Sequence, residues 1–153
     1  GGDGGGEDGD GADGGGGGDL DTKGEATAKL TTKETKKDEY RVAILPVGVE
    51  ELVRSGHTVT LQKTAGSGSG LPDGLYEECG ATIVDTAAEV FASSDLIVKV
   101  KEPQPDEIAL IRPRQIVFTY FHFAADRELT ERFLETGATA VAYETLRDEL
   151  GTL

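Results

Sequence analysis

The sequence contains no methionine, no tryptophan and a single cysteine among its 153 residues. Because Cys79 has no second cysteine to pair with, an internal disulfide is excluded, and this argues against a disulfide-stapled secreted fold. We interpret Cys79 as a small buried hydrophobic residue, since no motif of a reactive cysteine surrounds it. The absence of methionine at position 1 indicates a fragment or a processed product.

Positive charge is also scarce, since 15 lysines and arginines face 29 acidic residues and give a formal net charge of −14. A protein with this charge is repelled by phosphate backbones, which argues against binding to nucleic acid. The sequence has no apolar run of about 18 residues, the length that a membrane-spanning helix needs. We therefore expect neither a nucleic-acid partner nor a membrane partner.

Glycine and acidic residues are concentrated at the start of the chain. Residues 1–21 hold twelve of the 22 glycines and seven acids, with no basic residue. Such a segment buries too little apolar surface to offset its ordering entropy, so we predict a disordered leader over residues 1–27. The leader lacks the apolar core of a secretory signal and the arginines of a mitochondrial one, and we expect a cytoplasmic protein.

Strand-like and helix-like segments alternate from residue 28 onward, and we assign residues 28–153 to one domain. Short apolar runs bounded by turn residues predict strands near 28–32 and at 58–62, 81–85, 95–100, 115–121 and 138–143. Amphipathic segments predict helices from Pro46 to Gly56 and near 73–79, 86–92, 106–111 and 126–136. The expected fold class is α/β: a doubly wound, mainly parallel sheet with helices on both faces, preceded by the disordered tail.

Three polar residues fall near the edge of this sheet where ligands bind, beyond the carboxyl ends of the strands. Lys101 and His122 each come directly after a predicted strand, one strand–helix–strand unit apart. Arg41 belongs to the connection between the first strand and the Pro46 helix. An arginine fork binds a carboxylate, a nearby lysine polarises a carbonyl, and a histidine transfers a proton near neutral pH. Together they suit a small 2-oxo or 2-amino acid.

Each of these residues has a purely structural alternative. Arg41 would pair with a surface acid, Lys101 would form a solvated pair with Glu102, and His122 would be a core histidine among aromatic residues. Lys99 is the rival lysine, and we predict that its side chain snorkels to the edge of the sheet.

The glycine-rich tract 66–70 resembles a phosphate-binding loop. A dinucleotide fingerprint requires glycine where Leu71 stands, and a helix should begin at once, whereas Leu71-Pro72 intervenes. We therefore interpret the tract as a flexible turn. No metal site is predicted, since the leader's aspartates do not match a calcium-binding loop.

Five segments follow one another in a characteristic order, at 39–52, 65–70, 95–103, 118–126 and 142–145. Together they resemble the start of the alanine dehydrogenases and of the related transhydrogenase subunits, over about residues 29–153. The Lys-Val-Lys-Glu-Pro run that ends at Pro103 and the histidine at position 122 make the resemblance specific. His122 favours alanine dehydrogenase, because the transhydrogenases usually lack a histidine there.

The resemblance implies the substrate-binding part of an NAD-dependent oxidoreductase that interconverts L-alanine and pyruvate plus ammonia. By motif match, Arg41 would hold the substrate carboxylate, Lys101 would orient the carboxylate and carbonyl, and His122 would act as acid/base or as donor to the carbonyl oxygen. NAD would be bound by a Rossmann domain absent from this chain, so we expect no turnover from the 153 residues alone. Family members are commonly homohexamers, which implies a homo-oligomer for the full-length enzyme.

Other functions stay open on the residues alone. They are a transhydrogenase α-subunit, a saccharopine-type dehydrogenase fragment, and a non-catalytic module that binds a keto acid or an amino acid. The chain also departs from the family at two points near Arg41. Leu30-Thr31-Thr32 replaces an apolar first strand, and Leu45 replaces the threonine that usually precedes the proline and caps the helix.

Overall fold

The computed structural model describes residues 33–147 and residue 151. The predicted leader and the predicted strand near 28–32 lie outside the described residues. From Pro46 onward, the helices and strands alternate in the order expected from the sequence, and each predicted element has its counterpart within three residues at either end.

The strands are β1 (Thr60–Gln62), β2 (Thr82–Val84), β3 (Leu96–Lys101), β4 (Ile116–Tyr120) and β5 (Thr139–Ala142). The α-helices are α1 (Pro46–Arg54), α2 (Asp73–Glu78), α3 (Ala87–Ser93), α4 (Pro105–Ile108) and α5 (Arg127–Glu135). Among the described residues, short 3-10 helices form at η1 (Ser67–Ser69), η2 (Phe123–Ala125) and η3 (Tyr143–Thr145). The helix starts follow the sequence: Pro46 and Pro105 suit a first helical turn, and Thr86 and Asp126 cap α3 and α5 through their side chains.

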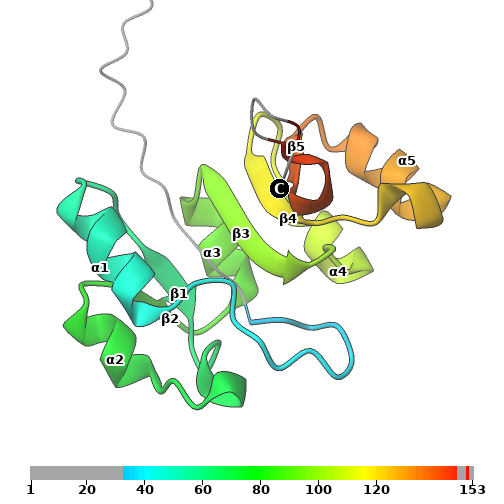
Figure 1. Cartoon of the computed structure of the whole chain (residues 1–153). Coiled ribbons are helices and arrows are strands. Elements are labelled where there is room, and N and C mark those ends of the chain that lie inside the picture. The colour runs from blue at the N-terminus through cyan, green and yellow to red at the C-terminus, as the bar shows by residue number, and fades with distance from the viewer. Residues whose placement is uncertain (1–32, 148–150, 152–153) are drawn as a thin grey trace, which may run out of the picture.

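The strand pairings within the described residues are parallel. β1 pairs with β2, and β4 lies between β3 and β5, so that Val117 stands opposite both Ile97 and Ala140. Figure 1 shows β1 and β2 with α1 and α2 in one half of the molecule, β4 and β5 with α5 in the other, and β3 between them. This arrangement of parallel strands and covering helices confirms the doubly wound α/β fold class.

Two apolar clusters lie on opposite faces of the strands. Consecutive strand residues point to opposite faces, and in β3 Ile97 joins one cluster while Val98 joins the other. The first cluster includes Val90, Phe91, Val117, Phe121 and Phe133, and the second includes Val49, Val59, Leu61 and Tyr76. Both faces of β3 are therefore covered, which explains the apolar run Leu96-Ile97-Val98 at its start.

Two predictions about buried residues need correction. Lys99 does not snorkel, because its side chain is only 1% exposed and its Nζ lies 3.1 Å from Glu34 Oε2 and 2.9 Å from Glu107 Oε1. Two carboxylates offset the cost of burying this ammonium. The sequence pattern could not show that these carboxylates lie next to Lys99. Cys79 is half-buried rather than buried, and it packs against the cluster around Tyr76.

None of the helices within residues 33–147 combines the length and the apolar character needed to cross a bilayer.

Candidate functional site

Arg41, Lys101 and His122 line one cavity of about 380 Å³. Lys101 ends β3, His122 follows β4, and Arg41 lies in the loop before α1. Because β3 and β4 are parallel neighbours, their carboxyl ends meet at one edge, where ligands bind in such folds. Val100, Tyr120 and Tyr143 complete the lining. The structure thus brings together the three residues that the sequence singled out.

Lys101 reaches the cavity beside an aromatic ring. Its Nζ lies 5.9 Å from the centroid of the Tyr120 ring, within the range of a cation–π contact. The solvated pair with Glu102 considered above is not what the structure shows, since Glu102 pairs with Lys36. The ammonium of Lys101 is therefore directed to a site with an aromatic wall.

His122 is exposed, so the alternative of a core histidine is wrong. Its backbone lies in the left-handed region, at φ 57° and ψ 30°, which costs a residue other than glycine about 1–3 kcal/mol. The backbone N–H of His122 donates to Glu144 Oε1 at 2.8 Å, and its ring lies 4.3 Å from that of Tyr120. These contacts hold the His122 backbone in its left-handed conformation and keep the imidazole at the cavity.

Arg41 holds a carboxylate at the rim of the cavity. Its Nε and Nη2 donate to the two carboxylate oxygens of Glu39 at 2.8 and 2.6 Å. These bonds lower the pKa of Glu39 to about 2, and the charge of Lys101 acts in the same direction. Arg41 therefore pairs with an acid of its own loop, as its structural alternative predicted, and it also lines the cavity. The guanidinium and the ammonium form a positive site that already attracts one carboxylate.

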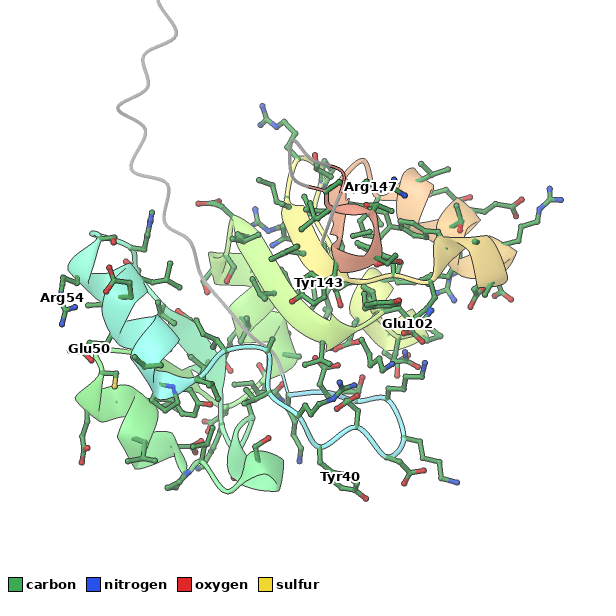
Figure 2. The ribbon with its side chains drawn as sticks, in the orientation of Figure 1. Tyr40, Glu50, Arg54, Glu102, Tyr143 and Arg147 are labelled. Atoms are coloured by element: carbon green, nitrogen blue, oxygen red, sulfur yellow. The ribbon has the colours of Figure 1, made fainter. Side chains whose placement is uncertain are left out.

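The glycine-rich tract supports the loop that carries Arg41. It forms the turn η1, in which Ser69 Oγ donates to the Tyr40 carbonyl at 2.9 Å. A Cβ at Gly68 would lie 2.8 Å from the same carbonyl, which explains the glycine. Figure 2 shows Tyr40 projecting outward from this loop. The sequence predicted a flexible turn, and the structure shows a turn whose close packing on the loop needs glycine.

Sequence reasoning did not single out Tyr143, which lines the cavity, or Glu34 and Glu39, which bind the backbone of Lys101 and the side chain of Arg41. The Tyr143 hydroxyl donates to the Lys99 carbonyl at 2.8 Å, and burial raises its pKa to about 12, so the phenol keeps its proton. Burial also raises the pKa of Glu34, against the opposing effect of Lys99. Tyr143 stood within the 142–145 motif and could have been found there, whereas the two glutamates lie in a polar loop without a distinguishing pattern.

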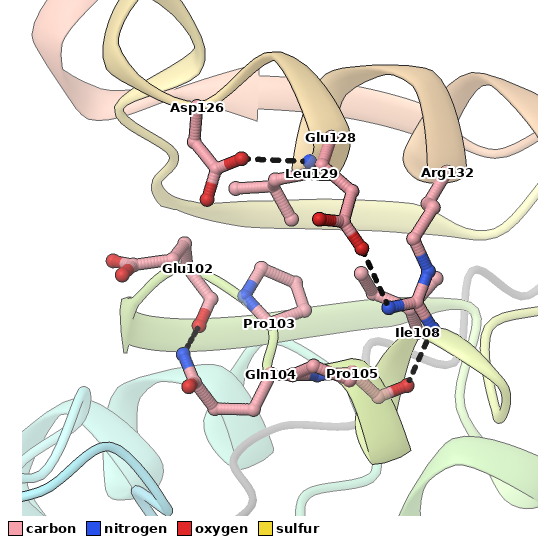
Figure 3. A pocket seen from close by; sticks show the side chains of 9 residues that line it. All are labelled: Glu102, Pro103, Gln104, Pro105, Ile108, Asp126, Glu128, Leu129 and Arg132. Carbon is pink, nitrogen blue, oxygen red and sulfur yellow. Dashed lines mark hydrogen bonds and ion pairs between the residues drawn. The ribbon is translucent and has the colours of Figure 1, made fainter.

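Two further cavities lie nearby. One, of about 390 Å³, shares Tyr120 and His122 with the cavity that Arg41 and Lys101 line, so His122 lines both cavities. The other, of about 170 Å³, is drawn in Figure 3 between α4 and α5. Its polar groups largely serve the fold, since Asp126 Oδ1 caps α5 by accepting from the Leu129 N–H at 2.9 Å and Arg132 lies 3.9 Å from Glu128.

In the part of the chain that the structure describes, no group of three histidine, cysteine, aspartate or glutamate side chains could hold a metal ion.

The family model described as "Alanine dehydrogenase/PNT, N-terminal domain" matches residues 30–152. The chain belongs to this family. Its members include the alanine dehydrogenase of Mycobacterium tuberculosis (strain ATCC 25618 / H37Rv), which is 48% identical over 120 residues, covering 78% of this chain and 32% of the relative. The alanine dehydrogenase of Bacillus subtilis (strain 168) is 41% identical over 116 residues, covering 76% and 30%. The resemblance found in the sequence is thereby confirmed.

Solved structures give the same result. An L-alanine dehydrogenase is 42% identical, with a TM-score of 0.78 over 81% of this chain and 34% of that one. A transhydrogenase from Sinorhizobium meliloti is 30% identical, with a TM-score of 0.69 over 75% of this chain and 35% of that one. The chain spans about a third of the length of the curated relatives of this family that it matches.

Proposed function

We propose that this chain is the substrate-binding amino-terminal part of an NAD-dependent alanine dehydrogenase. In the complete enzyme, L-alanine, NAD and water would be converted to pyruvate, ammonia and NADH. The observation that carries the proposal is the cavity in which Arg41, Lys101 and His122 meet, because this combination of groups suits a small 2-oxo or 2-amino acid. The family's alanine dehydrogenases, at 41–48% identity, support the same reading.

Each residue has a proposed role. Arg41 binds the substrate carboxylate, and the substrate competes with Glu39 for the guanidinium fork. Lys101 orients the carboxylate and the carbonyl, and its position over Tyr120 keeps the ammonium at the cavity wall. His122 acts as acid/base or donates a hydrogen bond to the carbonyl oxygen. None of these steps requires a metal.

NAD, when bound, would accept the hydride from the substrate's α-carbon. The described residues do not fit this cofactor: η1 is followed by Leu71 and Pro72 rather than directly by a helix, and it packs on the Arg41 loop instead of presenting an open phosphate-binding turn. We therefore assign no NAD-binding residue to this chain, and we expect no NADH formation from L-alanine with the 153 residues alone.

Family membership extends the proposal to the complete enzyme. We propose a homo-oligomer, such as a hexamer, in the cytoplasm, with L-alanine and pyruvate as small-molecule partners and no nucleic-acid or membrane partner. The division into a leader at 1–27 and a substrate domain at 28–153 belongs to the same proposal.

A transhydrogenase subunit is the second candidate, and the structural match to the Sinorhizobium meliloti protein favours it. No specific observation favours the other two alternatives, a saccharopine-type dehydrogenase and a non-catalytic binding module. His122 at the cavity favours alanine dehydrogenase over these, because it supplies the proton-transferring group that the reaction needs.

Calorimetric titration of the 153-residue chain with pyruvate tests the proposal. We expect saturable binding that is lost in Lys101→Ala and in His122→Ala. Arg54→Ala is the matched control, since Arg54 is an exposed α1 residue that pairs with Glu50 and Glu51 and does not line the cavity. Absence of heat at millimolar pyruvate, or equal binding by all the variants, would contradict the proposal.

A further inference from the structure

The end of β3 carries a bulge. Val98 stands opposite Phe118 and Lys101 stands opposite Tyr120, so three steps along β3 match two steps along β4. A bulge leaves an extra residue outside the ladder and re-aims the side chains beside it. Consecutive residues of a regular strand point to opposite faces, yet Val100 and Lys101 both line the candidate site. The bulge therefore helps to direct the side chain of Lys101 into the candidate site.

Side chains bind the backbone at this bulge. The N–H groups of Val100 and Lys101 donate to the two carboxylate oxygens of Glu34, at 2.7 and 3.4 Å. The Lys101 carbonyl accepts from Thr119 Oγ1 at 2.8 Å. Glu34 comes from the loop before α1, and Thr119 from β4, so the backbone of Lys101 is held from both sides.

Glu34 is itself held in place. Its side chain is 2% exposed, and its Oε2 accepts from Lys99 Nζ at 3.1 Å. A buried ion pair is weak evidence of stabilisation, because the desolvation penalty offsets the attraction between the charges. What distinguishes Glu34 is its contact with the backbone of the bulge.

We propose that Glu34 is a positioning residue that fixes Lys101 in the candidate site, with Thr119 holding the other side of the same residue. The inference rests on the proposed function, in which Lys101 orients the substrate. Glu34 does not line the cavity, so its effect on the substrate is exerted through Lys101.

Glu107 provides a matched control. It also pairs with Lys99, at 2.9 Å, and it is also buried, with its side chain 4% exposed. Its second carboxylate oxygen accepts from the N–H of Gln104, the N-cap of α4, instead of the backbone of Val100 and Lys101. Glu107→Gln therefore perturbs the same buried charge cluster without touching the bulge.

Pyruvate affinity and amide resonances are compared in the wild-type chain, Glu34→Gln and Glu107→Gln. In Glu34→Gln an amide NH₂ replaces one acceptor and faces a backbone donor, so we expect pyruvate to bind roughly tenfold more weakly. Glu107→Gln should stay within about twofold of the wild type, whatever its stability. The N–H resonances of Val100 and Lys101 should shift in the first variant and hold in the second.

Equal losses of affinity in the two variants would overturn the inference, because Glu34 would then act only through the buried charge. If the wild-type chain binds no pyruvate, the proposed function fails, and the backbone N–H resonances alone decide the positioning role. Shifts of the Val100 and Lys101 resonances in Glu34→Gln but not in Glu107→Gln support that role, and unchanged resonances refute it. Should Glu34→Gln fail to fold, Thr119→Val removes the bond to the Lys101 carbonyl at nearly constant volume and is judged in the same way.

Discussion

Replacing Lys99 by methionine removes the ammonium that lies between the buried carboxylates of Glu34 and Glu107. The side chains of Glu34 and Glu107 are 2% and 4% exposed, so water does not take its place. At least one carboxyl must then bind a proton for the chain to fold. For a glutamate with the ordinary pKa of 4.5, protonation at pH 7 costs about 3.4 kcal/mol, because each pH unit is worth about 1.36 kcal/mol.

This cost agrees with the roughly 3–5 kcal/mol that removal of one partner from a buried ion pair takes from the free energy of unfolding. A domain of this kind has about 5–15 kcal/mol in total, so Lys99→Met should be seriously weakened at pH 7. The loss also depends on pH. A carboxyl whose pKa is raised by folding stabilises the fold below its unfolded pKa and loses that contribution as the pH rises, so the deficit should shrink to about 0.7 kcal/mol at pH 5.

Urea unfolding followed by circular dichroism at pH 7 and pH 5 measures this difference. Lys63→Met is the control, because the Lys63 side chain is 61% exposed and its Nζ lies 3.7 Å from Asp85, and a change of within about 0.5 kcal/mol is expected there. A deficit for Lys99→Met below about 1 kcal/mol at pH 7, or one of the same size at both pH values, would refute the reasoning.

Three other predictions concern the cavity. Glu39→Gln should tighten pyruvate binding severalfold, because it frees the guanidinium of Arg41. Since the pKa of Glu39 is about 2, its carboxylate is fully charged above about pH 4.5, and calorimetry should give the same gain in affinity at pH 5.5 and pH 8. A gain at only one of these pH values would contradict the prediction. Gly68→Ala should weaken pyruvate binding by displacing the Tyr40 carbonyl, and wild-type affinity would disprove this. His122→Gly should abolish pyruvate binding. Its free energy of unfolding should stay within about 1 kcal/mol of the wild type, since glycine accepts the left-handed backbone conformation. A large loss of stability in thermal unfolding would contradict that explanation.

The sequence predicted the elements well because apolar runs and helix starts are local. Lys101 and His122 could be placed at one edge because each follows a strand in a parallel arrangement, where carboxyl ends meet. The burial of Lys99 could not be predicted in this way, since its partner Glu34 lies 65 residues away and no periodic pattern links them.

The bulge at the end of β3 was equally hidden. It becomes visible only in the pairing of Val98 and Lys101 with β4, and its supports come from side chains on other elements. Glu39 lies two residues from Arg41, yet its bidentate bond depends on the conformation of the loop that the η1 turn supports. Contacts of this kind are set by tertiary structure rather than by residue spacing.

The decisive measurement is a map of backbone amide shifts as pyruvate is added to the 153-residue chain. A substrate site at the carboxyl ends of β3 and β4 predicts saturable shifts centred on Arg41, Lys101 and His122, with the cavity between α4 and α5 unaffected at Leu129 and Arg132. Shifts centred on Leu129 and Arg132, or none at millimolar pyruvate, would contradict it.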